Sequence, residues 1–174
     1  FIFGTIGRLV PVKGHIDLIE AFSLLKDEYP TALVAIIGEG RSRTELENAI
    51  TRHKLEDRVL LLGEHTDALQ YVKAFDAFIM PSLSEGLPLA LLEGMSGHLP
   101  VAGSDIDSLR PVLEDCGARI FPVNQPSAMA KCLRDILNCS REQLHAAGER
   151  NYAYLCRSHA IENFRTQYRN LLVG

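Results

Sequence analysis

The feature that most constrains the fold of this chain is the alternation of short apolar runs with longer helical patterns. Six short apolar runs occur before residue 122, and segments with helical periodicity separate them. This order is typical of repeated βαβ units, which place parallel strands in one buried sheet. We therefore expect an α/β fold with a doubly wound, six-stranded parallel sheet. The expected strands are Ile2–Gly7, Ala32–Ile37, Val59–Leu62, Ala77–Met80, Val101–Gly103 and Arg119–Phe121.

Helical segments connect these strands and continue after the last one. The alternation stops after Phe121, so residues 1–123 are expected to form the sheet portion and residues 124–174 a helical C-terminal tail. Ser42 with Glu45, and Ser140 with Gln143, have the spacing of a capping box and predict two helix starts. The expected helices are His15–Lys26, Arg43–His53, Asp67–Phe75, Pro88–Ser96, Ser108–Asp115, Pro126–Asn138, Arg141–Leu155 and His159–Leu172.

Length and composition agree with one globular domain. The chain has 174 residues, of which 47% are hydrophobic and 23% charged, enough apolar material for a full core. The chain starts inside an apolar run, Phe1-Ile2-Phe3, so we expect residues 1–174 to be a fragment whose preceding domain is absent.

Charge and cysteine usage exclude several classes of protein. The formal net charge is −4, and acids alternate with bases, so we expect no nucleic-acid partner. No apolar run reaches the roughly 18 residues that span a bilayer, and no signal peptide opens the chain, so a cytoplasmic location is expected. The spacing of the four cysteines favours free or buried thiols over a disulfide framework or a zinc site. The four cysteines are Cys116, Cys132, Cys139 and Cys156.

Two carboxylates, Glu85 and Glu93, are the leading candidates for a binding site. They lie eight positions apart in SLSEGLPLALLEGM, and an entirely helical spacing would separate them by about 12 Å, roughly a sugar, a diphosphate and a ribose end to end. Glu93 lies in a stretch too apolar for an ordinary solvent face. The alternative is structural, with Glu85 capping a helix and Glu93 on its wet face.

Two cations, Arg8 and Lys13, follow the first expected strand. Ligands of an open parallel sheet collect at the carboxyl ends of its strands, and the helix after Pro88 would present free amides and its positive dipole end there. The two cations and this helix end could therefore hold a diphosphate without a metal. Solvated loop charges are the alternative for Arg8 and Lys13.

The motifs GRL, KG, IIGEGRSRTELE, PSLSEGLPLALLEGM and HLPVAGSD occur in this order over about residues 7–123. Together they resemble the C-terminal, donor-binding domain of retaining glycosyltransferases of the GT-B fold, family 4. The resemblance implies a Rossmann-like half of that fold, with Arg8 and Lys13 on the donor diphosphate. It implies Glu85 on hydroxyls of the transferred sugar and Glu93 on the ribose. Other donor-binding residues implied are Gly86, Leu87, Leu89 and Ala90 through their backbone amides, and Gly38, Glu39, Gly63 and Glu64 near the nucleobase.

The resemblance also implies a reaction. A sugar would pass from a nucleotide diphosphate donor to an acceptor hydroxyl with retention, without metal or cofactor, and a UDP-sugar is favoured over a GDP-sugar. Arg8, Lys13 and Glu85 would carry the catalysis, Glu85 by positioning the sugar rather than attacking it. The absent N-terminal domain would bind the acceptor, so residues 1–174 alone are expected to transfer no sugar. A role in bacterial surface-polysaccharide biosynthesis is common in this family, and a peripheral position at the inner membrane face is the alternative location for the full-length enzyme.

One stretch departs from the family pattern, and two other functions stay open. The family often has Gly-Gly followed by Pro-Glu where this chain has Asp105-Ile106-Asp107-Ser108-Leu109-Arg110-Pro111. Asp105-x-Asp107 superficially matches the metal-binding D-x-D of another glycosyltransferase fold, but we expect Asp107 or Ser108 to cap a helix rather than to bind a metal. We expect surface roles for His15 and His65. The alternatives are a nucleotide-sugar epimerase of the same fold and a non-catalytic nucleotide-binding module.

Overall fold

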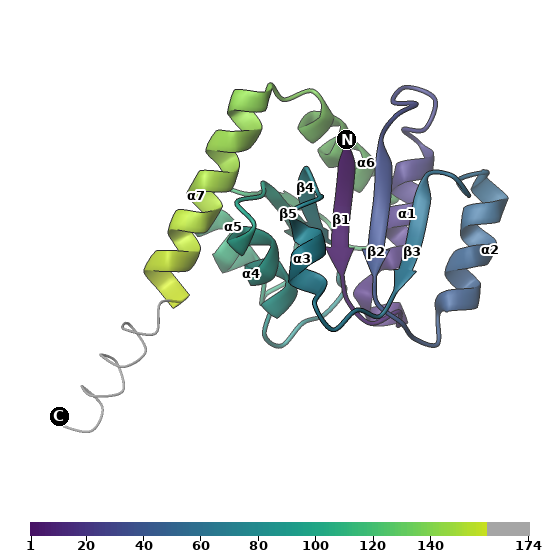
Figure 1. Ribbon diagram of the computed structural model, residues 1–174, viewed down its shortest axis with the longest axis horizontal. Helices are drawn as coiled ribbons and strands as arrows, with labels where there is room; N and C mark the ends of the chain where they lie inside the picture. The colour runs from purple at the N-terminus through teal and green to yellow at the C-terminus, as the bar shows by residue number, and fades with distance from the viewer. Residues whose placement is uncertain (160–174) are drawn as a thin grey trace.

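The computed structural model describes residues 1–159, which form a six-stranded parallel sheet with helices on both faces (Figure 1). The strand order is β3-β2-β1-β4-β5-β6, so the expected doubly wound α/β fold is confirmed. The strands are β1 (Ile2–Ile6), β2 (Leu33–Ile37), β3 (Val59–Gly63), β4 (Ala77–Met80), β5 (Val101–Ser104) and β6 (Arg119–Phe121). The helices are the 3-10 turn η1 (Pro11–Lys13), α1 (His15–Ser23), α2 (Arg43–His53), α3 (Ala68–Val72), α4 (Leu89–Ser96), α5 (Arg110–Asp115), α6 (Pro126–Leu137) and α7 (Arg141–His159).

The sheet separates two hydrophobic cores because neighbouring strand residues point to opposite faces. Ile36 packs in the core shared with α1, α2 and α6, whereas Ile37 packs in the core shared with α4, α5 and α7. Phe22 of α1 and Met95 of α4 are fully buried, one in each core. Consecutive apolar residues in one strand thus serve both layers, as expected for a parallel sheet covered on both sides.

Several helix boundaries in the structure differ from those predicted from the sequence. Helix α1 ends at Ser23, earlier than predicted, and the turn η1 was not predicted. The predicted break after Leu155 is wrong, because α7 continues without interruption to His159. The remainder of the predicted helix 159–172 lies outside the described residues.

One of the two predicted capping boxes is confirmed. Gln143 N donates to Ser140 Oγ at 3.2 Å, and Ser140 N donates to Gln143 Oε1 at 2.8 Å. At the start of α2, Ser42 makes no side-chain capping bond, so that prediction is wrong. A capping residue usually has an extended backbone, but the backbone of Ser42 has φ −86° and ψ 2°. The amide of Ser42 donates to Leu9 O at 2.9 Å.

The C-terminal helices pack on both layers of the sheet. Helix α6 lies against α1, and α7 lies against α4 and β5. A Cβ on Gly148 of α7 would lie 1.9 Å from His98 O, so this glycine permits close approach of the two backbones. Asn151, which is buried, donates to Leu99 O at 2.9 Å. The predicted tail is thus an integral part of the domain up to residue 159.

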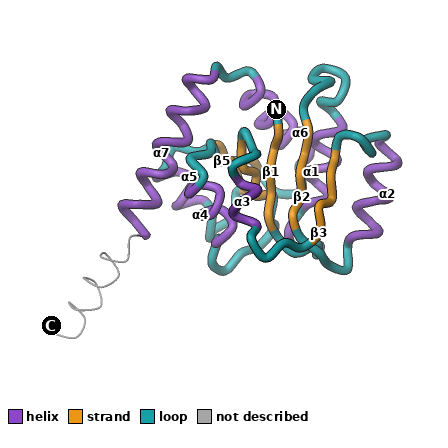
Figure 2. The backbone as a smooth tube through the Cα atoms, in the orientation of Figure 1, coloured by secondary structure: helices purple, strands orange, loops and turns teal. Residues whose placement is uncertain are grey.

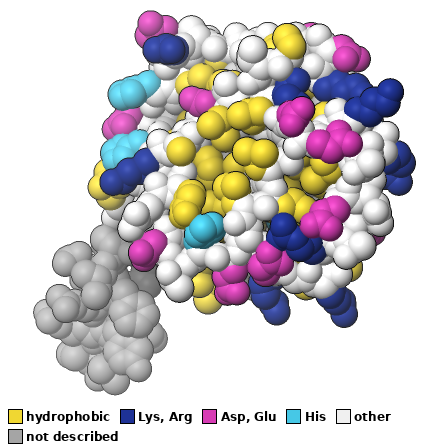
Figure 3. All heavy atoms as spheres, turned by 45° about the vertical axis from the view of Figure 1, so that its right-hand side comes forward, with side chains coloured by type: hydrophobic (Ala, Val, Ile, Leu, Met, Phe, Trp, Pro, Cys, Tyr) yellow, Lys and Arg dark blue, Asp and Glu magenta, His cyan; other side chains and the backbone are white. Residues whose placement is uncertain are grey.

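The edge strand β3 carries an apolar face that is open to solvent. Leu60 and Leu62 are 38% and 37% exposed, and no helix covers the front of β2 and β3 in Figure 1. Figure 3 shows hydrophobic side chains gathered on this side of the molecule. All four cysteines are free thiols, as predicted. Among the helices of residues 1–159, none has the length and apolar character that a membrane crossing requires.

Candidate functional site

The strand order reverses direction between β1 and β4, and the loops that follow these two strands meet there. The carboxyl ends of the strands lie at one edge of the sheet (Figure 2). Leu83 N donates to Val12 O at 2.8 Å, which joins the two loops. Gly14 adopts φ +66°, and a Cβ there would lie 2.0 Å from Pro81 O. Only glycine fits this contact, because it alone tolerates both the backbone conformation and the close approach.

Lys13 and Glu85 form an ion pair across these loops. Lys13 Nζ lies 2.5 Å from Glu85 Oε1, and the two side chains are 20% and 7% exposed. Ser82 Oγ donates to the same carboxylate oxygen at 2.7 Å. The structure therefore brings together the predicted diphosphate cation and the predicted sugar carboxylate. The fixed hydroxyl of Ser82 was missed from the sequence, although its place at the end of β4 could have indicated it.

Arg8 lies on the wall of a pocket next to this pair. The pocket holds about 280 Å³, and among the described residues the guanidinium of Arg8 has no ion-pair partner. A Cβ on Gly38 would lie 2.0 Å from Gly7 O, so a glycine is needed where the β1 and β2 loops touch. The lining residues are Ile6, Gly7, Arg8, Ile37, Gly38, Glu39, Glu64 and His65. The structure thus gathers Arg8 with three of the four residues predicted near a nucleobase.

His65 lines this pocket, and two contacts hold its partly exposed ring. Its Nε2 lies 3.0 Å from Leu62 O, and its Nδ1 lies 3.0 Å from the hydroxyl of Tyr71. The two rings also contact each other, with centroids 4.5 Å apart. At the rim, Arg43 binds Glu39 and Glu47. Arg43 was not predicted, although its position four residues from each acid indicates such pairs.

The segment from Glu85 to Pro88 is not helical, and α4 begins only at Leu89. The separation of about 12 Å inferred from an entirely helical spacing therefore does not apply. Leu89 N donates to Leu87 O at 2.9 Å, so this predicted ligand amide already has a partner. A Cβ on Gly86 would meet no atom within 4 Å. The backbone at Gly86 therefore borders open space in which a ligand could approach.

Glu93 lies in the second turn of α4 and is half-buried. Burial raises the pKa of its carboxyl, as expected when desolvation disfavours the charged form. The structural alternative, a carboxylate on a wet helix face, does not describe this position. Glu85 does not cap α4 either, because that helix has no side-chain capping bond.

The loop after β5 faces the Glu85 loop across a cavity of about 400 Å³ lined in part by Asp107 and Ser108. The first residue of this loop, Asp105, pairs with Arg110 at 2.6 Å. The cap residue of α5 is Leu109, without a side-chain capping bond. The prediction that Asp107 or Ser108 caps this helix is therefore wrong. Within residues 1–159 the structure has no group of three or more His, Cys, Asp or Glu residues that could hold a metal ion.

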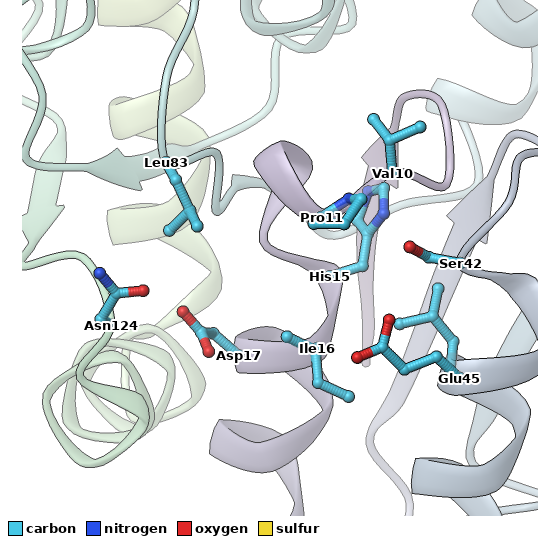
Figure 4. Close-up of a pocket in the computed structure, with 10 residues that line it drawn as sticks. Val10, Pro11, His15, Ile16, Asp17, Ser42, Glu45, Leu83 and Asn124 are labelled. Carbon is cyan, nitrogen blue, oxygen red and sulfur yellow. The ribbon is translucent and has the colours of Figure 1, made fainter.

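His15, expected at the surface, is only 3% exposed. Burial, aided by the charge of Lys13, lowers the pKa of its imidazole to about 4. Its Nδ1 is buried without a hydrogen-bond partner. The sequence carried a signal that was missed, because His15, Leu18, Ile19 and Phe22 follow the helical spacing of a core face. Figure 4 shows His15 behind Pro11 in a cavity of about 140 Å³ that Asp17 and Glu45 also line.

Fold and site define a Rossmann-like α/β domain with a pocket at the switch point of its sheet, lined by Arg8 and by the carboxylates of Glu39 and Glu64. The chain belongs to the family Glycosyl transferases group 1, whose sequence model matches residues 1–154.

Three known proteins illustrate the similarity. The chain is 38% identical over 110 residues to the UDP-Gal:alpha-D-GlcNAc-diphosphoundecaprenol alpha-1,3-galactosyltransferase of Escherichia coli, covering 62% of this chain and 28% of that protein. The structure of S. aureus TarM with UDP, fondaparinux and alpha-GlcNAc-glycerol superposes with a TM-score of 0.91 at 23% identity, covering 99% of this chain and 35% of TarM. Anabaena HepE with UDP and glucose gives a TM-score of 0.88 at 21% identity, covering 99% of this chain and 48% of HepE. The chain thus spans less than half of each protein, and the two structural matches show a shared fold.

Proposed function

We propose that this chain is the donor-binding domain of a retaining glycosyltransferase of family 4, which binds a nucleotide diphosphate sugar. The observation that carries the proposal is the Lys13–Glu85 pair at 2.5 Å, placed between the Arg8 pocket and the start of α4. A diphosphate needs cations and free amides, and a sugar needs hydrogen-bond acceptors. The site offers both kinds of group at adjacent positions.

We propose the following reaction at these groups. The bond between the anomeric carbon and the diphosphate oxygen would break while the acceptor hydroxyl oxygen bonds to the same face of the sugar. The hydroxyl proton would pass to the departing diphosphate. Arg8, Lys13 and the positive end of α4 would stabilise the leaving-group charge, without a metal ion. Glu85 would orient the sugar hydroxyls and Glu93 would accept the ribose hydroxyls.

The second half of the cleft would come from an N-terminal domain that binds the acceptor. The chain spans less than half of each of the three proteins compared above. A UDP-sugar is the favoured donor, because the E. coli relative is named for UDP-Gal and the TarM and HepE structures contain UDP. The pocket at Gly38, Glu39 and Glu64 would then receive the base.

Calorimetric titration of the chain with UDP and GDP, with and without Mg²⁺, tests the site. We expect UDP to bind in the absence of Mg²⁺, and Glu93→Ala to weaken that binding. Absence of binding by either nucleotide, or an unchanged Kd in Glu93→Ala, would contradict the proposed site. A donor screen on the longer enzyme, with products identified by mass, tests turnover and separates transfer from epimerisation or simple binding.

A further inference from the structure

Buried His15 lies beside the cation expected at the diphosphate, and the reaction proposed above gives it no role. A Cβ added to Gly7 would lie 3.8 Å from His15 Nε2 and 3.6 Å from Lys13 Cδ. The imidazole and the Lys13 stem therefore approach the same point, the backbone of Gly7 directly after β1. This is the carboxyl end of the strand at the switch point, where the proposed donor would lie.

The imidazole is uncharged at neutral pH, since its pKa is about 4. The charged groups near it are Lys13 from the preceding turn, Asp17 in the first turn of α1, and Glu45 of α2 across the shared cavity. Burial and the Lys13 charge oppose protonation more strongly than the two acids favour it. A neutral imidazole carries one N–H and one acceptor nitrogen.

The position of that N–H follows from the unpartnered Nδ1. An N–H group that is buried without an acceptor is rarer in proteins than an acceptor without a donor, because the lost hydrogen bond is not recovered. Nδ1 is buried and has no partner, so the proton belongs on Nε2. Nε2 is the nitrogen that approaches Gly7.

We infer that His15 is a donor-site residue, whose Nε2–H donates an uncharged hydrogen bond to a phosphate oxygen of the nucleotide diphosphate that Lys13 neutralises. This inference rests on the proposed function. The buried ring is already ordered, so the hydrogen bond requires little further loss of side-chain entropy. A neutral donor also binds the phosphate without adding repulsion to Arg8 and Lys13.

The test compares UDP with uridine on the wild-type chain, His15→Leu and His15→Gln, with NMR titration for the weaker ligand. We expect His15→Leu to bind UDP about tenfold more weakly or worse, as for loss of a hydrogen bond to a charged group, and uridine equally well. Glutamine places an amide N–H near the position of Nε2, so His15→Gln should recover most of the UDP affinity. Equal losses for uridine and UDP, or no loss for UDP, would overturn the inference.

A second measurement needs no variant. Long-range ¹⁵N–¹H correlation on ¹⁵N-histidine-labelled wild-type chain should show His15 as the Nε2–H tautomer, with a shift of its Nε2 resonance when UDP is added. An Nδ1–H tautomer, or an unmoved resonance at saturating UDP, would overturn the inference even if His15→Leu does not fold. Failure of the wild-type chain to bind UDP or GDP would instead refute the proposed function itself.

Discussion

Lys13 Nζ lies 2.5 Å from Glu85 Oε1, so one ion pair unites the loops after β1 and β4. Ser82 Oγ donates to the same oxygen at 2.7 Å, and the Glu85 side chain is almost completely buried. The pair therefore holds both residues in place before any ligand arrives. A bound phosphate would compete with Glu85 for the ammonium of Lys13, which links the geometry at the sugar to that at the diphosphate.

Replacing Lys13 tests how strongly this pair supports the fold. Lys13→Met keeps most of the apolar stem and leaves Glu85 with only Ser82 as a partner, so we expect the free energy of unfolding to fall by about 1 to 3 kcal/mol. Urea denaturation at pH 7 measures the change. In the double variant Lys13→Met/Glu85→Gln the carboxylate charge is also gone, and part of the stability should return. Purely additive losses would show that the pair contributes nothing to the fold.

Two glycines of the site loops should respond oppositely to alanine. Gly14→Ala places a Cβ 2.0 Å from Pro81 O at a φ of +66°, so we expect a loss of about 2 kcal/mol or more in unfolding free energy. Gly86→Ala meets no atom within 4 Å, so its Tm should equal that of the wild-type chain. If the donor passes close to Gly86, the same variant should weaken UDP-sugar binding. A destabilised Gly86→Ala would refute the open space described at this position.

Glu93→Gln should separate stability from binding. Burial raises the pKa of Glu93, so the folded state favours the protonated form, and this group's contribution to stability is lost as pH rises through the folded pKa. At pH 7 the neutral glutamine should therefore give an equal or higher Tm. UDP affinity should fall about tenfold, because a ribose hydroxyl loses a charged acceptor. A lower Tm together with unchanged affinity would assign Glu93 a structural role instead.

The pH dependence of stability should carry the signature of His15. Its pKa is 6.5 in the unfolded chain and about 4 in the folded one, so the unfolded state binds more protons between these values. The contribution is complete above pH 6.5 and is lost as pH falls towards 4, with a slope of up to about 1.4 kcal/mol per pH unit. Urea unfolding of wild type and His15→Leu over this range measures the difference. Parallel curves for the two proteins would contradict the burial of a neutral imidazole.

The two serines with capping-box spacing should differ in their effect on stability. Ser140→Ala removes the bond from Gln143 N and should lower the unfolding free energy by about 1 kcal/mol. Ser42→Ala removes no side-chain cap and should change it by less than about 0.5 kcal/mol. Thermal unfolding of both variants under one condition provides the comparison. Equal losses would indicate that Ser42 caps α2 in solution.

The six strands could be predicted because each needs only a short apolar run between helical patterns, and such a pattern acts over a few residues. Helix ends were less predictable. α1 ends at Ser23 and α7 passes Leu155, and no local residue marks either boundary. The capping box predicted at Ser42 does not form. The Ser42 amide donates instead to Leu9 O, a residue outside the motif.

The sequence by itself determined the alternation of strands and helices, the family motifs, and the loops that carry Arg8, Lys13, Glu85 and Glu93. Only the tertiary structure decided that Lys13 pairs with Glu85, 72 positions away, and that the buried His15 ring approaches the backbone of Gly7. The physical reason is the distance along the chain over which the interactions act. Secondary structure follows from side chains a few positions apart, whereas an ion pair or a buried ring depends on which strands become neighbours in the sheet.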